Sequence, residues 1–117
     1  MAYMFAGAWD FNQPLESWDV SHVTTMVYMF AWARAFNQPL GTWDVSHVTT
    51  MAHMFARAWR FNQPLGTWDV SQVKNMVWMF SCVTLSAQNY DQLLFGWAEF
   101  CLLYTSDAAD EEDSVDL

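Results

Sequence analysis

The sequence predicts an α/β solenoid of 25-residue strand–turn–helix units, with a short parallel sheet on one side and helices on the other. The first observation behind this prediction is a repeat. FNQPLESWDVSHVTTMVYMF at 11–30 returns, with few changes, at 36–55 and at 61–80. Residues 11–35 and 36–60 agree at 18 of 25 positions. The second observation is that the apolar spacing within each copy changes from a period of two to a helical period.

The strand is expected in the segment PLGTWDVS of the second copy. Leu40, Trp43 and Val45 follow the L-x-x-L-x-L spacing of a leucine-rich-repeat strand. Trp43 and Val45 would then share a buried face, while Asp44 points the other way. The unit is therefore predicted to be leucine-rich-repeat-like.

The helix is expected in the following segment, SHVTTMAHMFARA. Ser46 is a suitable N-cap, because its hydroxyl can accept a hydrogen bond from a first-turn amide. The apolar residues follow a helical spacing and predict one buried stripe: Val48, Met51, Met54, Phe55 and Ala58. A helix here would supply the crossover that parallel strands need.

Stacked units would place like residues on like residues. We expect aromatic ladders of Phe11, Phe36 and Phe61, of Trp18, Trp43 and Trp68, and of Phe5, Phe30, Phe55 and Phe80. Two polar ladders, Asn12, Asn37 and Asn62 with Gln13, Gln38 and Gln63, are expected to bond the backbone of the loops.

The motif FNQPL-x-x-WDVS-x-V-x-x-M-x-x-MF resembles the repeat of BspA-like leucine-rich-repeat surface proteins, whose relatives include mycoplasma proteins of unknown function. The resemblance covers essentially all of residues 1–100. It implies a bacterial surface or secreted location and an adhesion-like role. It assigns no catalytic residue.

The chain is predicted to have three parts. Residues 1–82 are the repeat array, which starts inside a unit because 1–10 match 26–35. No signal peptide or membrane span is expected, and the uncovered edge near Trp18 favours self-association. Residues 83–100 are predicted to be a helical cap opened by Asn89 and Gln92. Its apolar stripe would be Tyr90, Leu93, Leu94 and Trp97.

Residues 101–117 are predicted to be a non-native acidic tail without fixed structure. CLLYTSDAADE and SVDL resemble translated pieces of a transposase sequencing adapter, in the right frame and at the right spacing. A natural disordered tail is the alternative. The tail holds six of the 13 acidic residues, so residues 1–100 carry a net charge of −3 while the whole chain carries −9. Overall acidity therefore does not indicate a basic partner.

An outward row of carboxylates is the main candidate for a binding surface. Asp19, Asp44 and Asp69 alternate with buried residues, and bonds to local turn donors are their expected role. Calcium binding is an alternative, although one carboxylate per unit offers few oxygens. The neighbouring residues that could also face a ligand are Thr42, Thr67, His22 and His47.

A second candidate surface consists of positions that differ between units: Trp32, Arg57, Trp59, Arg60 and Trp78. Varied aromatic and arginine residues on a regular frame are typical of recognition surfaces, and also of unconstrained loops. Nucleic-acid binding is not expected, because the four basic residues form no stripe.

The expected function is non-catalytic binding to a protein or glycan on a host or neighbouring cell, as part of a bacterial surface protein. A rigid spacer is one alternative. A polysaccharide-active enzyme using Asp19, Asp44 and Asp69 is another. No enzyme activity, metal or cofactor is expected, because the sequence has no metal-ligand spacing, phosphate loop or nucleophile motif.

Overall fold

The computed structural model describes residues 1–97. Within this range the chain has one helix, α1, at Ala87–Gly96, and no strand. Isolated parallel bridges join Thr50 to Thr25 and to Asn75. The predicted α/β fold class, a leucine-rich-repeat-like solenoid with a parallel sheet backed by helices, is therefore wrong.

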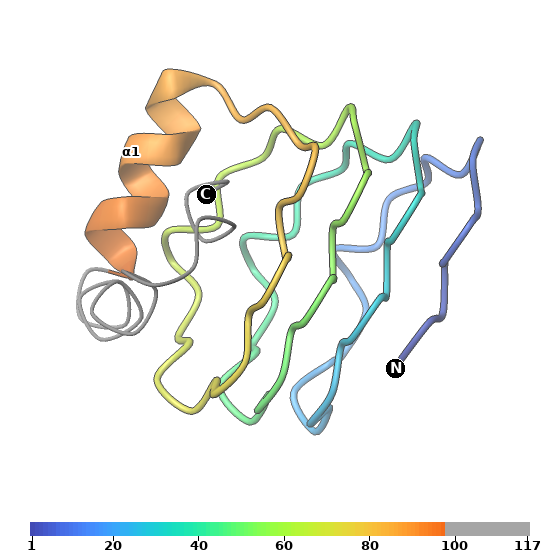
Figure 1. Ribbon diagram of the computed structural model, residues 1–117. Helices are drawn as coiled ribbons and strands as arrows, with labels where there is room; N and C mark the ends of the chain where they lie inside the picture. Colours follow the sequence, from blue (N-terminus) through green and yellow to red (C-terminus); the bar gives the residue numbers. More distant parts are fainter. Residues whose placement is uncertain (98–117) are drawn as a thin grey trace.

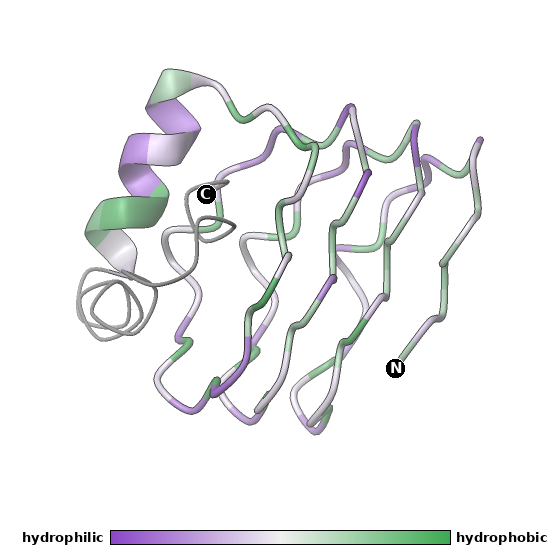
Figure 2. Cartoon of the chain, in the orientation of Figure 1, coloured by the Kyte–Doolittle hydropathy of each residue, from purple (hydrophilic) through white to green (hydrophobic). Residues whose placement is uncertain are grey.

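The 25-residue units nevertheless lie side by side as irregular coils, with α1 at one end of the stack and the N-terminus at the other (Figure 1). Backbone N–H groups of one coil donate to carbonyl oxygens of the next coil. Met26 donates to Thr50 at 3.0 Å, and Phe30 donates to Met54 at 2.8 Å. Green and purple stretches both occur along the coils in Figure 2, so apolar and polar residues are interspersed within the units.

The segment predicted to be helical is a series of tight turns. The N–H of Met29 donates to the carbonyl of Met26 at 3.2 Å. The N–H of Ala33 donates to Phe30 at 2.9 Å, and all four side chains are buried. These turns repeat every three or four residues, so they produce the same buried spacing as a helix. The intervening N–H groups donate to carbonyl oxygens of the neighbouring coil. The backbone therefore satisfies its hydrogen-bonding groups without forming a helix.

These turns require a left-handed backbone at side-chain-bearing residues, which costs free energy. The affected residues fall at two equivalent positions of successive coils: Tyr3, Tyr28, His53 and Trp78, and Trp32, Arg57 and Cys82. The cost is offset partly by contacts between coils. Tyr3 stacks on Tyr28 at a centroid distance of 4.9 Å, and Tyr28 stacks on His53 at 4.4 Å.

The segment predicted to be a strand is extended only briefly between two turns. Trp43 donates to the carbonyl of Leu40, and Val48 to that of Val45. Trp43 and Val45 are buried and Asp44 is exposed, as predicted. Ser46 lies in the second turn and therefore is not a helix N-cap, contrary to the prediction.

Indole groups link the coils on this side of the stack. Nε1 of Trp43 donates to the carbonyl oxygen of Leu15 at 2.9 Å, and Nε1 of Trp68 donates to Leu40 at 2.8 Å. Trp18, which has no preceding coil of this kind beside it, is 38% exposed, whereas Trp43 is 4% exposed. Trp18 lies outside any strand, so the uncovered edge predicted near it is not the edge of a sheet.

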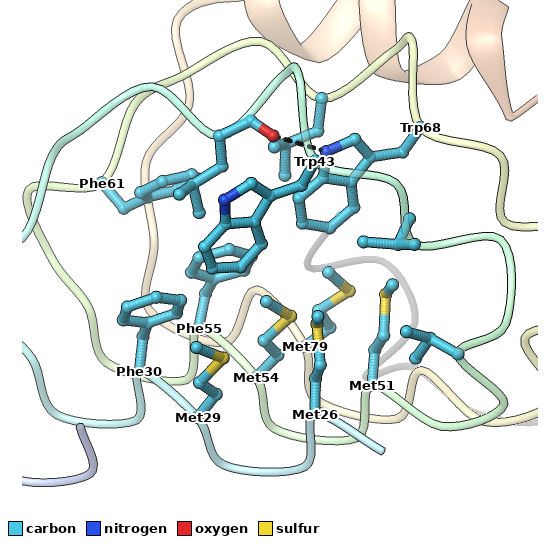
Figure 3. Packing of buried hydrophobic residues seen from close by; sticks show 14 of the residues in the cluster. Met26, Met29, Phe30, Trp43, Met51, Met54, Phe55, Phe61, Trp68 and Met79 are labelled. Atoms are coloured by element: carbon cyan, nitrogen blue, oxygen red, sulfur yellow. Dashed lines mark hydrogen bonds between the residues drawn. The ribbon is translucent and has the colours of Figure 1, made fainter. Parts of the chain in front are cut away.

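Stacked phenyl rings and thioethers fill the interior. The ladder from Phe5 through Phe30 and Phe55 to Phe80 is confirmed, with centroid distances of 5.5–5.7 Å. The ladder of Phe11, Phe36 and Phe61 is also confirmed. In Figure 3 the methionines Met26, Met29, Met51, Met54 and Met79 point from one side of the coils toward Trp43 and Trp68.

The predicted asparagine ladder is confirmed as a hydrogen-bonded one. Oδ1 of Asn37 accepts from the backbone N–H of Asn62 at 2.8 Å and from Nε2 of Gln63 at 3.0 Å. Asn12 bonds the second coil in the same way. Ser86 and Asn89 take these roles beside Asn62 at the last coil. The side chains thus join coils where the backbones do not pair.

Helix α1 covers the end of the stack, as predicted, but it begins earlier than expected. Ser86, and not Asn89, is the N-cap, and its Oγ accepts from the N–H of Asn89 at 3.2 Å. Leu93 and Trp97 are buried, while Leu94 is exposed. The predicted tail at 101–117 and the end of the predicted cap, 98–100, lie outside the described residues.

Candidate functional site

The carboxylate row has the outward placement that the sequence predicts. Asp19, Asp44 and Asp69 are all exposed. Oδ1 of Asp44 accepts hydrogen bonds from the backbone N–H of Ser46 at 3.0 Å and from its Oγ at 2.6 Å. Asp19 makes the same two bonds to Ser21. The predicted structural role, a carboxylate bonded to its own turn, is confirmed.

These bonds favour the charged form of each carboxyl group. The hydroxyl and then the N–H of Ser46 lower the pKa of Asp44 below its usual value, while repulsion from Asp19 is the smallest of the opposing effects. The pKa of Asp69 is lowered by Ser71 in the same way. Sugar hydrolysis would need one carboxyl group that stays protonated, and the row offers the opposite. Among residues 1–97, no three His, Cys, Asp or Glu side chains are grouped closely enough to hold a metal ion.

We expect Ser46→Ala to raise the pKa of Asp44 toward its usual value, because the variant loses the shorter of the two hydrogen bonds. A lowered folded-state pKa contributes stability above the unfolded pKa and loses it as the pH falls through the folded pKa. Wild type should therefore exceed the variant in stability near neutral pH, and the difference should fade in acid. Carboxyl NMR titration measures the shift. Asp19, bonded to Ser21, is the internal control, and equal Asp44 midpoints in both proteins would contradict the expectation.

The other residues predicted to face a ligand are two threonines that share a hollow and two exposed histidines. Thr42 and Thr67 are exposed and line a hollow of about 690 Å³ beside α1. His22 and His47 are exposed, and Nδ1 of His22 lies 3.3 Å from Oγ of Ser21. His53 is partly buried against Tyr28, which lowers its pKa.

Indole and guanidinium groups, all exposed except the half-buried Arg34, form a second surface, which we call the Trp–Arg cluster: Trp9, Trp32, Arg34, Arg57 and Trp59. Cζ of Arg34 lies 4.8 Å from the ring centroid of Trp9 and 4.8 Å from that of Trp59. Arg57 lies over Trp32 at 4.8 Å. The rings of Trp32 and Trp59 are 6.4 Å apart, so the two stacks are joined.

The 25-residue step builds this cluster. Trp9, Arg34 and Trp59 occupy one equivalent position of three successive coils, and Trp32 and Arg57 occupy another. Stacking of coils therefore puts each guanidinium against an indole of a neighbouring coil. Cation–π contacts of this kind stabilise by roughly 0.5–1 kcal/mol each at exposed sites.

A hollow of about 410 Å³ opens within the cluster. Its lining consists of Trp9, Asp10, Arg34, Ala35, Trp59 and Arg60. Asp10, Ala35 and Arg60 again occupy one equivalent position of three successive coils. Ala35, with its small side chain, belongs to the middle coil, and the two charged residues belong to the coils on either side. None of the predicted carboxylate-row residues lines this hollow.

The variable positions identified in the sequence supply much of this surface: Trp32, Arg57 and Trp59, with Arg60 in the hollow. Trp78 is exposed but belongs to the position of Tyr3 and Tyr28. Sequence reasoning missed Trp9 and Arg34. Steps of 25 residues from Trp59 lead to both of them, and that signal would have placed Arg34 between two indoles.

A family model described as "Mycoplasma protein of unknown function, DUF285" matches residues 1–95. No curated protein matches the chain. No solved structure matches it either. Over the described part of the chain, no helix has the length and apolar character needed to cross a membrane.

Proposed function

The chain belongs to the DUF285 family of mycoplasma-type proteins of unknown function, and from this premise we propose that it is a non-catalytic binding module of a bacterial surface protein. Its ligand is a protein or glycan on a host or neighbouring cell. The resemblance of the repeat to BspA-like surface proteins supports the location. The Trp–Arg cluster is the observation that carries the binding role.

The cluster has the composition of a binding hot spot. Tryptophan and arginine are the residues most enriched at the energetic centres of interfaces. Trp9, Trp32 and Trp59 are 55%, 43% and 44% exposed, although most large apolar side chains of the coils are buried. An exposed group of indoles in an otherwise well-packed molecule favours contact with a partner. The stacked arginines also lose little side-chain freedom on binding, because their neighbours already hold them.

The row of Asp19, Asp44 and Asp69 supports this proposal less well. One oxygen of each carboxylate, Oδ1, accepts from a serine of the same turn. The lowered pKa of each group disfavours the polysaccharide-active enzyme considered from the sequence.

The fluorescently labelled 117-residue chain tests the proposal by flow cytometry on animal epithelial cells and on bacteria. We expect saturable binding by the wild-type chain, and we expect both Arg57→Ala and Trp59→Ala to weaken it. Trp78→Ala is the matched control, because Trp78 is 39% exposed and lies outside the cluster. Absence of saturable binding, or equal loss in the control, would overturn the proposal. Absence of binding would favour the spacer role.

A further inference from the structure

We propose that the hollow between Trp9, Arg34 and Trp59 binds a carboxylate-bearing sugar residue, such as a uronic acid of a glycan. This inference rests on the proposed binding function and adds the chemical class of the ligand. It is carried by three features of the hollow: a guanidinium held between two indoles, a pair of opposite charges in its lining, and the exposed indoles themselves.

The stack prepares Arg34 for an anion. Indoles lie on both sides of its guanidinium, each with its centroid 4.8 Å from Cζ, and the residue is half-buried. A cation–π contact does not engage the N–H donors, which lie along the edge of the planar guanidinium. A planar carboxylate matches this edge through two parallel hydrogen bonds. Arg60, exposed in the same hollow, adds a second positive charge.

Asp10 distinguishes among the possible anions. Its exposed carboxylate lines the hollow with the two arginines and can accept hydrogen bonds from hydroxyl groups. An acidic sugar carries both kinds of partner, a carboxylate for the arginines and hydroxyls for Asp10. A polyanion without hydroxyls meets repulsion from Asp10 and from the net charge of −3 on residues 1–100. A neutral sugar would satisfy Asp10 but leave the paired arginines without a counter-charge.

The exposed indoles fit the apolar face of a sugar ring. Trp9 and Trp59 are 55% and 44% exposed, so part of each indole is open to a ligand. The C–H face of a pyranose is apolar and can cover such surface, which removes it from water. The volume of about 410 Å³ lies within the range of small-molecule sites, roughly 300–1,000 Å³. One or two sugar units would fill it.

NMR titration of the full chain tests the proposal through the indole N–H resonances. The probes are a glucuronate-terminated oligosaccharide, a neutral glucose oligosaccharide of the same length and a hexaglutamate peptide. We expect the acidic sugar to bind at least about tenfold more tightly than either other probe, because it alone combines a carboxylate for the arginines with hydroxyl groups for Asp10. The shifts should be largest at Trp9 and Trp59.

Three variants locate the site. Arg34→Lys keeps the charge but loses the planar donor edge, and we expect about tenfold weaker binding. Ala35→Gln should also weaken binding, because it fills the hollow without removing a cluster residue. Trp78→Ala should bind as wild type does. Equal binding of the neutral sugar, tighter binding of the peptide, no binding of the acidic sugar, or insensitivity to Arg34→Lys and Ala35→Gln would each overturn the ligand class. Cell binding that still depends on Arg57 and Trp59 would then leave the proposed function standing.

Discussion

Phe55→Ala is expected to lower the free energy of unfolding by about 3–5 kcal/mol, the usual cost of emptying a buried phenylalanine site. Phe55 is fully buried, and three rings stack against it. Its centroid lies 5.5 Å from Phe30, 4.1 Å from Phe61 and 5.7 Å from Phe80. The coils on both sides meet through this ring, so neither can close the cavity without breaking backbone bonds between coils. Urea denaturation of the full chain measures the loss.

Phe5→Ala is the matched control, because Phe5 occupies the equivalent position in the first coil. Phe5 stacks on Phe11 at 4.3 Å and on Phe30 at 5.5 Å, but it is only partly buried. Replacing Phe5 with alanine removes less buried apolar surface than replacing Phe55, so we expect a clearly smaller decrease in the free energy of unfolding. Equal losses in the two variants would mean that stacking at the centre of the ladder adds nothing to stability beyond what the end provides.

Which side chains are buried could be predicted from the sequence, because burial depends on spacing and the repeat. Met51, Met54, Phe55 and Ala58 are all buried, as the helical pattern predicts. The backbone could not be predicted in the same way. Tight turns and a helix both return a side chain to one face every three or four residues. The left-handed backbone at His53 decides between them, and it occurs equally at Tyr28 and Trp78, so no one residue type at this position signals it.

The candidate site was predictable in part for a related reason. Position-by-position comparison of the units identifies Arg57 and Trp59 as variable. The pairing of Arg34 with Trp59 arises only when the coils stack in register, because stacking brings residues that are 25 positions apart in the sequence into contact. The carboxylate row shows the converse. An aspartate stands at the position of Asp44 in every unit, which suggests a binding role. Its hydrogen-bond partner, Ser46, is only two residues away, so the aspartate is repeated because it stabilises the turn of each unit.

The cap keeps the ladders in register in spite of its helix. Nε1 of Trp97 donates to the carbonyl oxygen of Leu65 at 3.1 Å, the role that Trp68 has toward Leu40. The indole donor and its carbonyl acceptor are 32 residues apart at the cap and 28 residues apart within the array. The segment that contains α1 is therefore four residues longer than a coil, and it still places an indole at the equivalent point. A step of 25 residues from Trp68 leads to Leu93, which is buried in α1 instead. Insertion of a helix brings its backbone close to the last coil.

Gly66→Ala is expected to lower the free energy of unfolding by about 1–3 kcal/mol, the cost of overpacking a closed contact. A Cβ at Gly66 would collide with the carbonyl oxygen of Gln92 in α1 and would lie 3.0 Å from its carbon. Neither partner can move easily, because both are backbone atoms. Gly96, one turn further along α1, also packs against Gly66, and a Cβ there would collide with the carbonyl oxygen of Gly66. Urea denaturation gives the loss, and hydrogen exchange of α1 amides and of the Trp97 indole shows whether the cap detaches first.

Gly41→Ala separates this contact from a general need for glycine. Gly41 is the equivalent residue one coil earlier, and the first coil has Glu16 there. A Cβ at Gly41 would meet its nearest neighbour, the carbonyl oxygen of Pro64, at an ordinary 3.6 Å. Neither glycine has a left-handed backbone, so Gly41→Ala should be neutral or stabilise by roughly 0.4–1 kcal/mol through the unfolded chain. Similar losses in both variants would show that the turn itself requires glycine. A loss confined to Gly66→Ala, with faster exchange in α1, would show that glycine is required only where the helix replaces a coil.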